Sequence, residues 1–315
     1  MTRAKPLHTA ENIIGSSPEM DRVRNAIARV AGTRATVLLS GESGTGKELV
    51  ARAIHDNSER AGGPFVRLHC GGVPEDRQEG EIFGSDGEAE PRASRFTQAH
   101  GGTLFLDEIE QMSQGSQVRL LGVLEEHEVE QNGSSIEQID VRVVAATDKI
   151  LKELVDAGRF RDDLFYRLKV IDVRMPALRE RPSDIPELAS HFLRFYAEQN
   201  KKPIREISDA ALDLMKRYAW PGNVRELENV IEHAVVVADG TVIETRHLPA
   251  ELAAPKNDRV PTVPGATIDE LERYAILKTL EAVGGSTSKA AEKLGISVRK
   301  IQYKLQEYGS SGRGL

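Results

Sequence analysis

A glycine-rich stretch near the start of the chain reads Gly41-Glu42-Ser43-Gly44-Thr45-Gly46-Lys47-Glu48. It follows an apolar run, 36–40, that is typical of a buried strand, and it precedes a helix-like segment, 49–55. Glycines allow backbone N–H groups to turn inward around phosphate oxygens, a helix N-terminus adds partial positive charge, and a lysine reaches the outer phosphates. The stretch therefore predicts a nucleotide phosphate loop. The alternative, a glycine-rich loop without a ligand, is disfavoured because strand, spacing, lysine and helix are all present.

Acidic residues near this loop predict a magnesium site. Glu48 stands where a Ser or Thr hydroxyl usually meets Mg²⁺, and a carboxylate can hold that ion through water. A second apolar run follows Gly101-Gly102 and ends in Asp107-Glu108, at the sheet edge where α/β proteins bind ligands. We expect Asp107 to serve Mg²⁺ and Glu108 to orient or deprotonate the attacking water. A helix N-cap is the alternative interpretation of such an acidic pair.

Arginines in the segment 158–168 suit phosphoryl transfer. Arg161 and Arg167 lie six positions apart in it. A guanidinium supplied by a neighbouring subunit can stabilise charge on the γ-phosphate. Surface arginines are otherwise usually solvated charges, and the sequence alone leaves both interpretations open.

The order of predicted elements divides the chain. Strand-like runs at 36–40, 65–68, 103–106, 141–145 and 170–173 alternate with helical stretches, which predicts a doubly wound parallel α/β sheet. From 182 to 252 we expect only helices, and four prolines between 249 and 264 indicate a linker without regular structure. The predicted parts are a tail (1–12), a nucleotide-binding α/β domain (13–180), a helical lid (181–252), a linker (253–266), a DNA-binding domain (267–308) and a tail (309–315).

The last of these domains has the pattern of a helix–turn–helix. Ala290, Ala291 and Leu294 form the apolar face of its first helix, Gly295 allows the turn, and Ser297 caps the second helix. From residue 286 to 308 there are five Lys and Arg against two Glu, a local charge of +3. A small helical pair without DNA is the alternative. The residues predicted to face double-stranded DNA are Thr287, Ser288, Lys289, Val298, Arg299, Lys300, Gln302, Tyr303 and Lys304.

Composition indicates which partners and which cellular location suit these domains. The 315 residues carry a net charge of −7, which argues against a protein that coats nucleic acid with its whole surface but permits a small basic module. The single cysteine, Cys70, excludes an internal disulfide, and no run approaches the ~20 apolar residues of a membrane span. We expect a cytoplasmic protein with no membrane partner.

Further stretches at 14–20, 178–185 and 220–227 are specific to one family. With them the chain resembles, over about three-quarters of its length, the bacterial enhancer-binding proteins, the AAA+ activators of sigma-54 RNA polymerase. The resemblance implies an AAA+ P-loop parallel sheet with a helical lid subdomain, plus a small all-α Fis-type helix-turn-helix domain. It also implies ATP and Mg²⁺, a ring homohexamer, a homodimer on paired DNA half-sites about 34–36 Å apart, and an RNA polymerase holoenzyme partner. Two-component signalling is a common setting of the family.

Residue roles follow from the same resemblance. It implies that Ile14 lies against adenine, that Asp107 and Glu108 are the Walker B pair, and that Arg161 and Arg167 are arginine fingers acting across a ring interface. Arg225 matches the sensor arginine of the lid. The residues expected to bind the nucleotide are Ile14, Gly41, Glu42, Ser43, Gly44, Thr45, Gly46, Lys47, Glu48, Gly101, Gly102, Asp107, Glu108 and Arg225.

Three departures from the family pattern bear on function. After Phe83-Gly84 the segment 85–94 is short and acidic and lacks the Gly-Ala-Phe-Thr-Gly-Ala motif that touches sigma-54. His69 occupies a position where the family usually has asparagine, and Asp148 occupies one where it usually has asparagine or histidine. Both changes favour slower ATP hydrolysis. We therefore expect a DNA-binding regulator that acts on the ordinary polymerase, or as a repressor or coactivator. A DNA-binding scaffold with ATP as a structural ligand is the alternative. Whether a sensing domain precedes Ile14 in the natural protein is left open.

Overall fold

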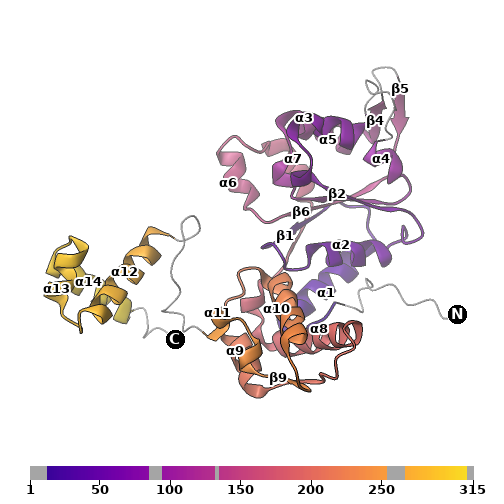
Figure 1. Ribbon diagram of the computed structural model, residues 1–315. Coiled ribbons are helices and arrows are strands. Elements are labelled where there is room, and N and C mark those ends of the chain that lie inside the picture. Colours follow the sequence, from indigo (N-terminus) through magenta and orange to yellow (C-terminus); the bar gives the residue numbers. More distant parts are fainter. Residues whose placement is uncertain (1–12, 85–93, 132–134, 254–266, 311–315) are drawn as a thin grey trace. The chain divides into compact units, whose positions relative to one another are not determined.

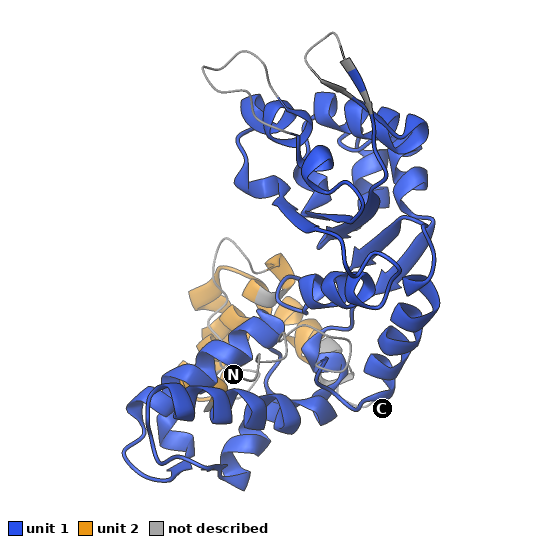
Figure 2. Ribbon diagram, turned by 90° about the vertical axis from the view of Figure 1, so that its right-hand side faces the viewer, with its two compact units in different colours: residues 1–248 blue, residues 249–315 orange. Residues whose placement is uncertain are grey.

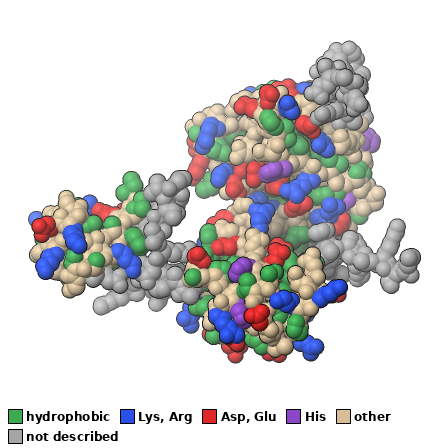
Figure 3. All heavy atoms as spheres, viewed as in Figure 1, with side chains coloured by type: hydrophobic (Ala, Val, Ile, Leu, Met, Phe, Trp, Pro, Cys, Tyr) green, Lys and Arg blue, Asp and Glu red, His purple; other side chains and the backbone are tan. Residues whose placement is uncertain are grey.

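The computed structural model describes residues 13–84, 94–131, 135–253 and 267–310, and it divides into two compact units, residues 1–248 and 249–315 (Figure 1, Figure 2). The first unit contains the sheet and the helices that follow it, and the second contains the C-terminal helices. Lys and Arg side chains are interspersed with Asp and Glu on the visible face of the first unit, without a single-sign patch (Figure 3).

A five-stranded sheet forms the centre of the first unit. Its order is β2 (Phe65–His69), β3 (Thr103–Asp107), β6 (Arg142–Thr147), β1 (Val37–Ser40) and β7 (Ile171–Arg174). Every neighbouring pair is parallel, and Ser40 at the end of β1 is level with Thr147 and Arg174. The five predicted strands and the α/β class are confirmed. Because all strands run the same way, the loops after β1, β3 and β6 meet at one edge of the sheet.

Helices cover both faces of this sheet (Figure 1). One face carries α1 (Pro18–Ala31) and α2 (Lys47–Asp56), and the other carries α3 (Glu75–Phe83), α4 (Arg95–Gln98), α5 (Gln114–Glu126), α6 (Leu151–Asp156) and α7 (Asp162–Leu168). Strand residues alternate between the two cores: Leu38 packs with the second set, whereas Val37 and Leu39 pack with α1 and α2. Two buried faces explain why the strands read as continuous apolar runs.

The helical lid follows the sheet within the same unit. Its helices are α8 (Ile185–Gln199), α9 (Asp209–Arg217) and α10 (Asn223–Val237). The prediction that this part is only helical is wrong at β8 (Glu206–Ile207) and β9 (Val242–Ile243), which pair in parallel. Strands of two residues are too short to show any periodicity. The sequence analysis also missed an antiparallel hairpin, β4 (Glu128–Gln131) and β5 (Ser135–Gln138).

Short 3₁₀ helices lie at the turns between these elements. They are Cys70–Gly72 (η2), Ile109–Gln111 (η3), Leu178–Glu180 (η4), Pro182–Asp184 (η5) and Thr245–His247 (η6). Two of them, η4 and η5, connect the sheet to the lid. No helix among the described residues is long and apolar enough to cross a membrane.

The second unit contains α11 (Ala250–Ala253), α12 (Ile268–Ala282), α13 (Thr287–Leu294) and α14 (Val298–Ser310). The linker prediction is wrong at α11, whereas residues 254–266 lie outside the described part of the chain. Ile276, Ala290, Ala291 and Ile301 form the core of the last three helices. The predicted helix–turn–helix is therefore present, with Gly295 in the left-handed conformation at φ 67°.

Candidate functional site

The glycine-rich loop leaves β1 and enters α2 at the carboxyl edge of the sheet. Gly41 and Gly44 have φ of 149° and 76°, values that disfavour any other residue. A Cβ at Gly41 would lie 2.7 Å from the Met175 carbonyl oxygen, and one at Gly44 would lie 2.2 Å from the Gly222 carbonyl oxygen. Backbone packing on both sides thus requires glycine at these two positions.

Lys47, the first residue of α2, points its ammonium into this loop. Its Nζ donates hydrogen bonds to the carbonyl oxygens of Gly41 and Glu42, at 2.6 and 3.1 Å. Burial lowers the pKa of Lys47, while the carboxylates of Asp107 and Asp148 act in the opposite direction. A partly desolvated cation at a helix N-terminus, inside a loop of turned backbone, fits the phosphates of a nucleotide.

The acidic residues predicted to hold Mg²⁺ lie close together. Arg67 of β2 contacts both: its Nη1 lies 2.6 Å from Glu48 Oε2, and its Nη2 lies 3.3 Å from Asp107 Oδ2. Two carboxylates that are close enough to contact one guanidinium can also supply oxygen ligands to a hard cation such as Mg²⁺. The structure thus brings Glu48 and Asp107 together, from α2 and β3, as the sequence analysis expects of a magnesium site.

Glu108 follows Asp107 in a left-handed conformation, with φ of 56°. Its Oε2 lies 3.8 Å from His69 Nε2, while His69 Nδ1 lies 3.9 Å from Asp107 Oδ2. His69 is level with Asp107 in the β2–β3 register, so its ring faces both acids. At Gly71 a Cβ would lie 2.3 Å from Glu108 Oε2, so this glycine leaves room for the carboxylate.

A further carboxyl group, that of Glu110, lies beside Asp148. Asp148 follows β6, and Glu110 belongs to η3 immediately after the Walker B pair. The two side-chain oxygens of Glu110 are inaccessible to water. Burial, together with the nearby Asp148 carboxyl, raises the pKa of Glu110 to about 7. Sequence analysis missed Glu110, whose only signal was its proximity to Asp107 and Glu108.

The lid meets the phosphate loop through the start of α10. Asn223 is fully buried, and its Nδ2 donates to the carbonyl oxygen of Ser43 at 2.9 Å. The backbone N–H of Val224 donates to the Gly44 carbonyl oxygen at 3.0 Å. Arg225, the predicted sensor, reaches the Ser43 hydroxyl at 3.2 Å. The lid therefore touches the loop by backbone and side chains together.

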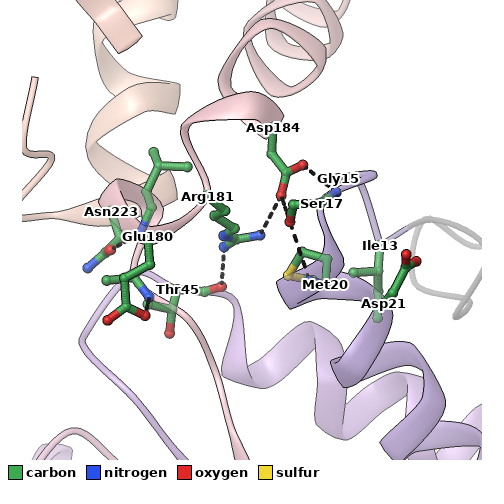
Figure 4. A network of polar contacts seen from close by, with 12 residues as sticks. Ile13, Gly15, Ser17, Met20, Asp21, Thr45, Glu180, Arg181, Asp184 and Asn223 are labelled. Carbon is green, nitrogen blue, oxygen red and sulfur yellow. Dashed lines mark hydrogen bonds and ion pairs between the residues drawn. The ribbon is translucent and has the colours of Figure 1, made fainter. Parts of the chain in front are cut away.

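A buried polar network joins three segments behind this loop (Figure 4). Arg181 Nη2 donates to the Thr45 carbonyl oxygen at 3.3 Å, and Arg181 Nη1 lies 3.9 Å from Asp184 Oδ2. Asp184 in turn accepts bonds from the backbone N–H and the hydroxyl of Ser17, at 2.8 and 2.7 Å. Ile14 is half-buried beside Gly15, where a Cβ would lie 2.7 Å from Asp184 Oδ2. The network thus fixes the segment that carries Ile14 against the loop.

Gly101 and Gly102 lie away from this site, at the opposite end of β3 from Asp107. A Cβ at Gly102 would lie 1.9 Å from the Pro64 carbonyl oxygen, and the backbone N–H of Gly101 donates to the Asp140 carbonyl oxygen at 2.9 Å. Their expected part in nucleotide binding is therefore corrected: Gly102 permits close packing against the turn that precedes β2, and Gly101 adopts a left-handed conformation, with φ of 73°.

The two candidate arginine fingers also lie outside the phosphate loop. Arg161 precedes α7 and forms an exposed two-bond pair with Asp163, at 3.0 and 2.6 Å. Arg167, in α7, donates to the Leu124 carbonyl oxygen at 2.5 and 3.2 Å. Neither touches the loop of its own chain, which is the arrangement expected if they act across a subunit interface.

The second unit exposes only part of the predicted DNA-facing set. Arg299, Lys300, Gln302 and Tyr303 of α14, with Ser288 and Lys289 of α13, are exposed, and Thr287 is half-buried. Val298 is corrected, because it packs with the core on the same helical face as Ile301 and Leu305. Two lysines are paired within the unit: Lys300 lies 2.5 Å from Glu272, and Lys304 lies 3.6 Å from Glu272 and 3.7 Å from Asp269. The exposed basic contribution of α14 therefore rests mainly on Arg299.

Comparison with known proteins agrees with this geometry. Residues 13–174 match the sigma-54 interaction domain, 179–263 match the AAA+ ATPase lid domain, and 267–308 match the bacterial regulatory proteins of the Fis family. The transcriptional regulatory protein ZraR of Salmonella typhimurium is 47% identical over 299 residues, which are 93% of this chain and 68% of that protein. The regulatory protein AtoC of Escherichia coli is 43% identical over 312 residues, covering 95% of this chain and 68% of its own length.

Solved structures give the same result. NtrX from Brucella abortus in complex with ADP superimposes with a TM-score of 0.74 and 34% identity, covering 95% of this chain and 70% of that one. The complex of the same protein with ATP gives a TM-score of 0.73, over 94% of this chain and 69% of the other. The fold prediction, an AAA+ P-loop sheet with a helical lid and a Fis-type domain, is confirmed.

Proposed function

Because this chain belongs to the sigma-54-dependent transcription regulators, with an AAA+ ATPase domain and a Fis-type DNA-binding domain, we propose that ATP binding and hydrolysis govern its assembly into a ring on DNA. The observation that carries the proposal is the meeting of the phosphate loop with two acid-bearing strand ends. Lys47 lies inside the loop that leaves β1. Asp107 ends β3 and Glu108 follows it, and Asp148 follows β6, the strand between β1 and β3. The structural neighbour NtrX forms complexes with ADP and with ATP, which supports nucleotide binding by this chain.

Each residue of the site has one task in this proposal. Lys47 and the loop N–H groups bind the phosphates, and Glu48 and Asp107 hold Mg²⁺, either directly or through water. The ion, when bound, neutralises charge that develops on the phosphate oxygens. Glu108 orients the water and accepts its proton, while His69 contacts the Glu108 carboxylate and holds its orientation.

A ring supplies what one chain lacks. Arg161 is exposed, pairs with Asp163, and lies outside its own phosphate loop. In a ring homohexamer it would face the γ-phosphate of the adjacent subunit, where an arginine in trans can raise the rate by about 10³–10⁵. Arg167 would support the same interface.

The DNA-binding domain would place a dimer on paired half-sites of double-stranded DNA about one helical turn apart. The polymerase contact is proposed to differ from that of the family, because the sequence after Phe83-Gly84 is acidic and lacks the motif that touches sigma-54. Residues 85–93 of that segment lie outside the described part of the chain. In vitro transcription with each polymerase holoenzyme in turn tests this point. ATP-dependent open complexes formed by sigma-54 polymerase would overturn it.

A second candidate function is a DNA-binding scaffold in which ATP is a structural ligand. The observation that favours it is the Asp148 carboxylate near Lys47, because a negative charge next to the phosphate site opposes the charge of the γ-phosphate. Steady-state phosphate release from the wild-type chain, from Glu108→Gln and from Arg161→Ala separates the two functions. Turnover that both substitutions abolish would eliminate the scaffold.

A further inference from the structure

The phosphate loop carries an acidic residue that the proposed mechanism does not use. Glu42 is the second residue of the loop, and its carbonyl oxygen lies 3.1 Å from Lys47 Nζ. A carboxylate beside a binding site for a polyanion opposes binding, because like charges repel over several ångströms at the dielectric constant of a protein surface. The loop is therefore suited to phosphates only while this charge is compensated.

The compensation comes from two residues on the lid side of the loop. Arg179 of η4 donates to both carboxylate oxygens of Glu42, at 2.7 and 2.5 Å. Asn223 Nδ2 donates a third bond to Glu42 Oε2 at 3.1 Å. The bond from Arg179 is the largest cause of a Glu42 pKa of about 2, so the carboxylate stays ionised and paired throughout the physiological range.

Asn223 connects this pairing to the lid. It is the first residue of α10, it is fully buried, and it adopts a left-handed conformation with φ of 53°. Its Oδ1 accepts a hydrogen bond from the backbone N–H of Leu178 at 2.8 Å, next to Arg179 in the chain. One side chain therefore holds η4, the start of α10 and Glu42 together. A movement of α10 away from the loop would break the bonds to Glu42 and withdraw η4 with it.

We propose that Glu42 makes nucleotide affinity depend on the position of the lid: the loop binds phosphates while Arg179 and Asn223 hold the Glu42 carboxylate, and it releases them when the lid withdraws both. Displacement of the lid leaves an unpaired negative charge beside the phosphates, so release is driven by repulsion as well as by lost contacts. Glu42, Arg179 and Asn223 are positioning residues in this scheme. The inference rests on the proposed binding of ATP by the loop.

Equilibrium binding of ATP, ADP and AMP to the full chain tests the inference at low and high salt. Arg179→Gln leaves Glu42 without its counter-charge, with only the bond from Asn223, and we expect it to weaken ATP binding about five- to tenfold at low salt, the size expected for one uncompensated charge at an exposed site. The loss should decrease in the order ATP, ADP, AMP, because the repulsion scales with ligand charge. Glu42→Gln in the Arg179→Gln background should restore ATP affinity to within about twofold of wild type.

Two further variants complete the experiment. Arg179→Lys keeps the positive charge and should retain most of the affinity. Arg246→Gln is the control, since Arg246 also belongs to the lid side and pairs with an acid, Glu244, at 3.1 Å, but does not touch Glu42. Equal losses for ATP, ADP and AMP, or a double variant as weak as Arg179→Gln, would overturn the inference while leaving ATP binding intact. A wild-type chain that binds no ATP would overturn the proposed function and this inference together.

Discussion

Replacement of Asp184 by alanine should destabilise the first unit more than any surface substitution. Asp184 is completely buried, accepts two hydrogen bonds from Ser17 at 2.8 and 2.7 Å, and lies 3.9 Å from the guanidinium of Arg181. The side chain of Arg181 is itself only 2% exposed, and its Nε has no hydrogen-bond partner among the described residues. Alanine at position 184 would therefore leave a buried cation without its counter-charge.

The magnitude follows from these contacts. Removal of one partner of a buried ion pair costs about 3–5 kcal/mol of unfolding free energy, mainly through the uncompensated charge. The two lost bonds from Ser17 leave a backbone N–H and a hydroxyl unpaired, which places the expected loss at the upper end of that range. For a unit of this size such a loss lowers Tm by about 8–15 °C. Replacement of both residues by apolar ones, Arg181→Met with Asp184→Leu, should recover the part of the loss that comes from the uncompensated charge.

Urea unfolding of the full chain, followed by far-ultraviolet circular dichroism, measures the effect. Asp21→Ala is the control, because Asp21 forms a shorter ion pair with Arg24, 2.6 Å against 3.9 Å, but is 61% exposed. That control should lose less than about 1 kcal/mol. A loss below about 1 kcal/mol for Asp184→Ala, or a double variant less stable than the single one, would refute the assignment of stability to this buried pair.

Three other predictions follow from the site and the DNA-binding domain. The pKa of Glu110 is raised to about 7 in the folded chain, so the folded state holds a proton that the unfolded state has lost, and stability should fall as the pH rises from about 5 to 8. Glu110→Gln should make this pH-dependent loss of unfolding free energy smaller by about 1–2 kcal/mol, a value reduced for partial solvent screening. Urea unfolding at pH 5 and pH 8 measures it, and an equal loss in the wild-type chain and the variant would contradict the prediction. Glu108→Gln should retain ATP affinity within about twofold and lose at least about 10²-fold in phosphate release, and an active variant would remove Glu108 from its role as base. Arg299→Ala should weaken operator binding and lower the slope of log binding constant against log salt concentration by about 1. Lys300→Ala should change this slope less, because Lys300 is paired with Glu272. Fluorescence anisotropy at several salt concentrations measures both slopes.

Local pattern was enough to predict the main elements. The apolar runs that became β1, β3 and β6 have no polar alternation because both faces of these strands are buried, and the glycine–lysine loop predicts where the phosphates would lie. The position of Asp107 and Glu108 at the carboxyl edge of the sheet could be predicted from sequence, because parallel strands bring their carboxyl ends to one edge. Helix periodicity likewise predicted α8, α9, α10 and the helix–turn–helix.

Contacts between segments far apart in the chain could not be predicted in the same way. The pairing of Glu42 with Arg179 spans 137 positions, and that of Ser17 with Asp184 spans 167, and neither leaves a periodic trace in the sequence. The same holds for Glu110, whose altered pKa depends on an Asp148 carboxyl that follows another strand. The sequence predicts that Lys300 and Lys304 face DNA, but in the folded chain both lie beside Glu272 of α12.

The sequence by itself therefore determined the family, the phosphate loop and the order of elements, because these depend on residue type and spacing over short stretches. The tertiary structure decided which charges are compensated. Electrostatic and hydrogen-bond energies depend on distance and burial rather than on sequence separation, so the partners of Glu42, Asp184 and Glu110 became visible only in the folded chain.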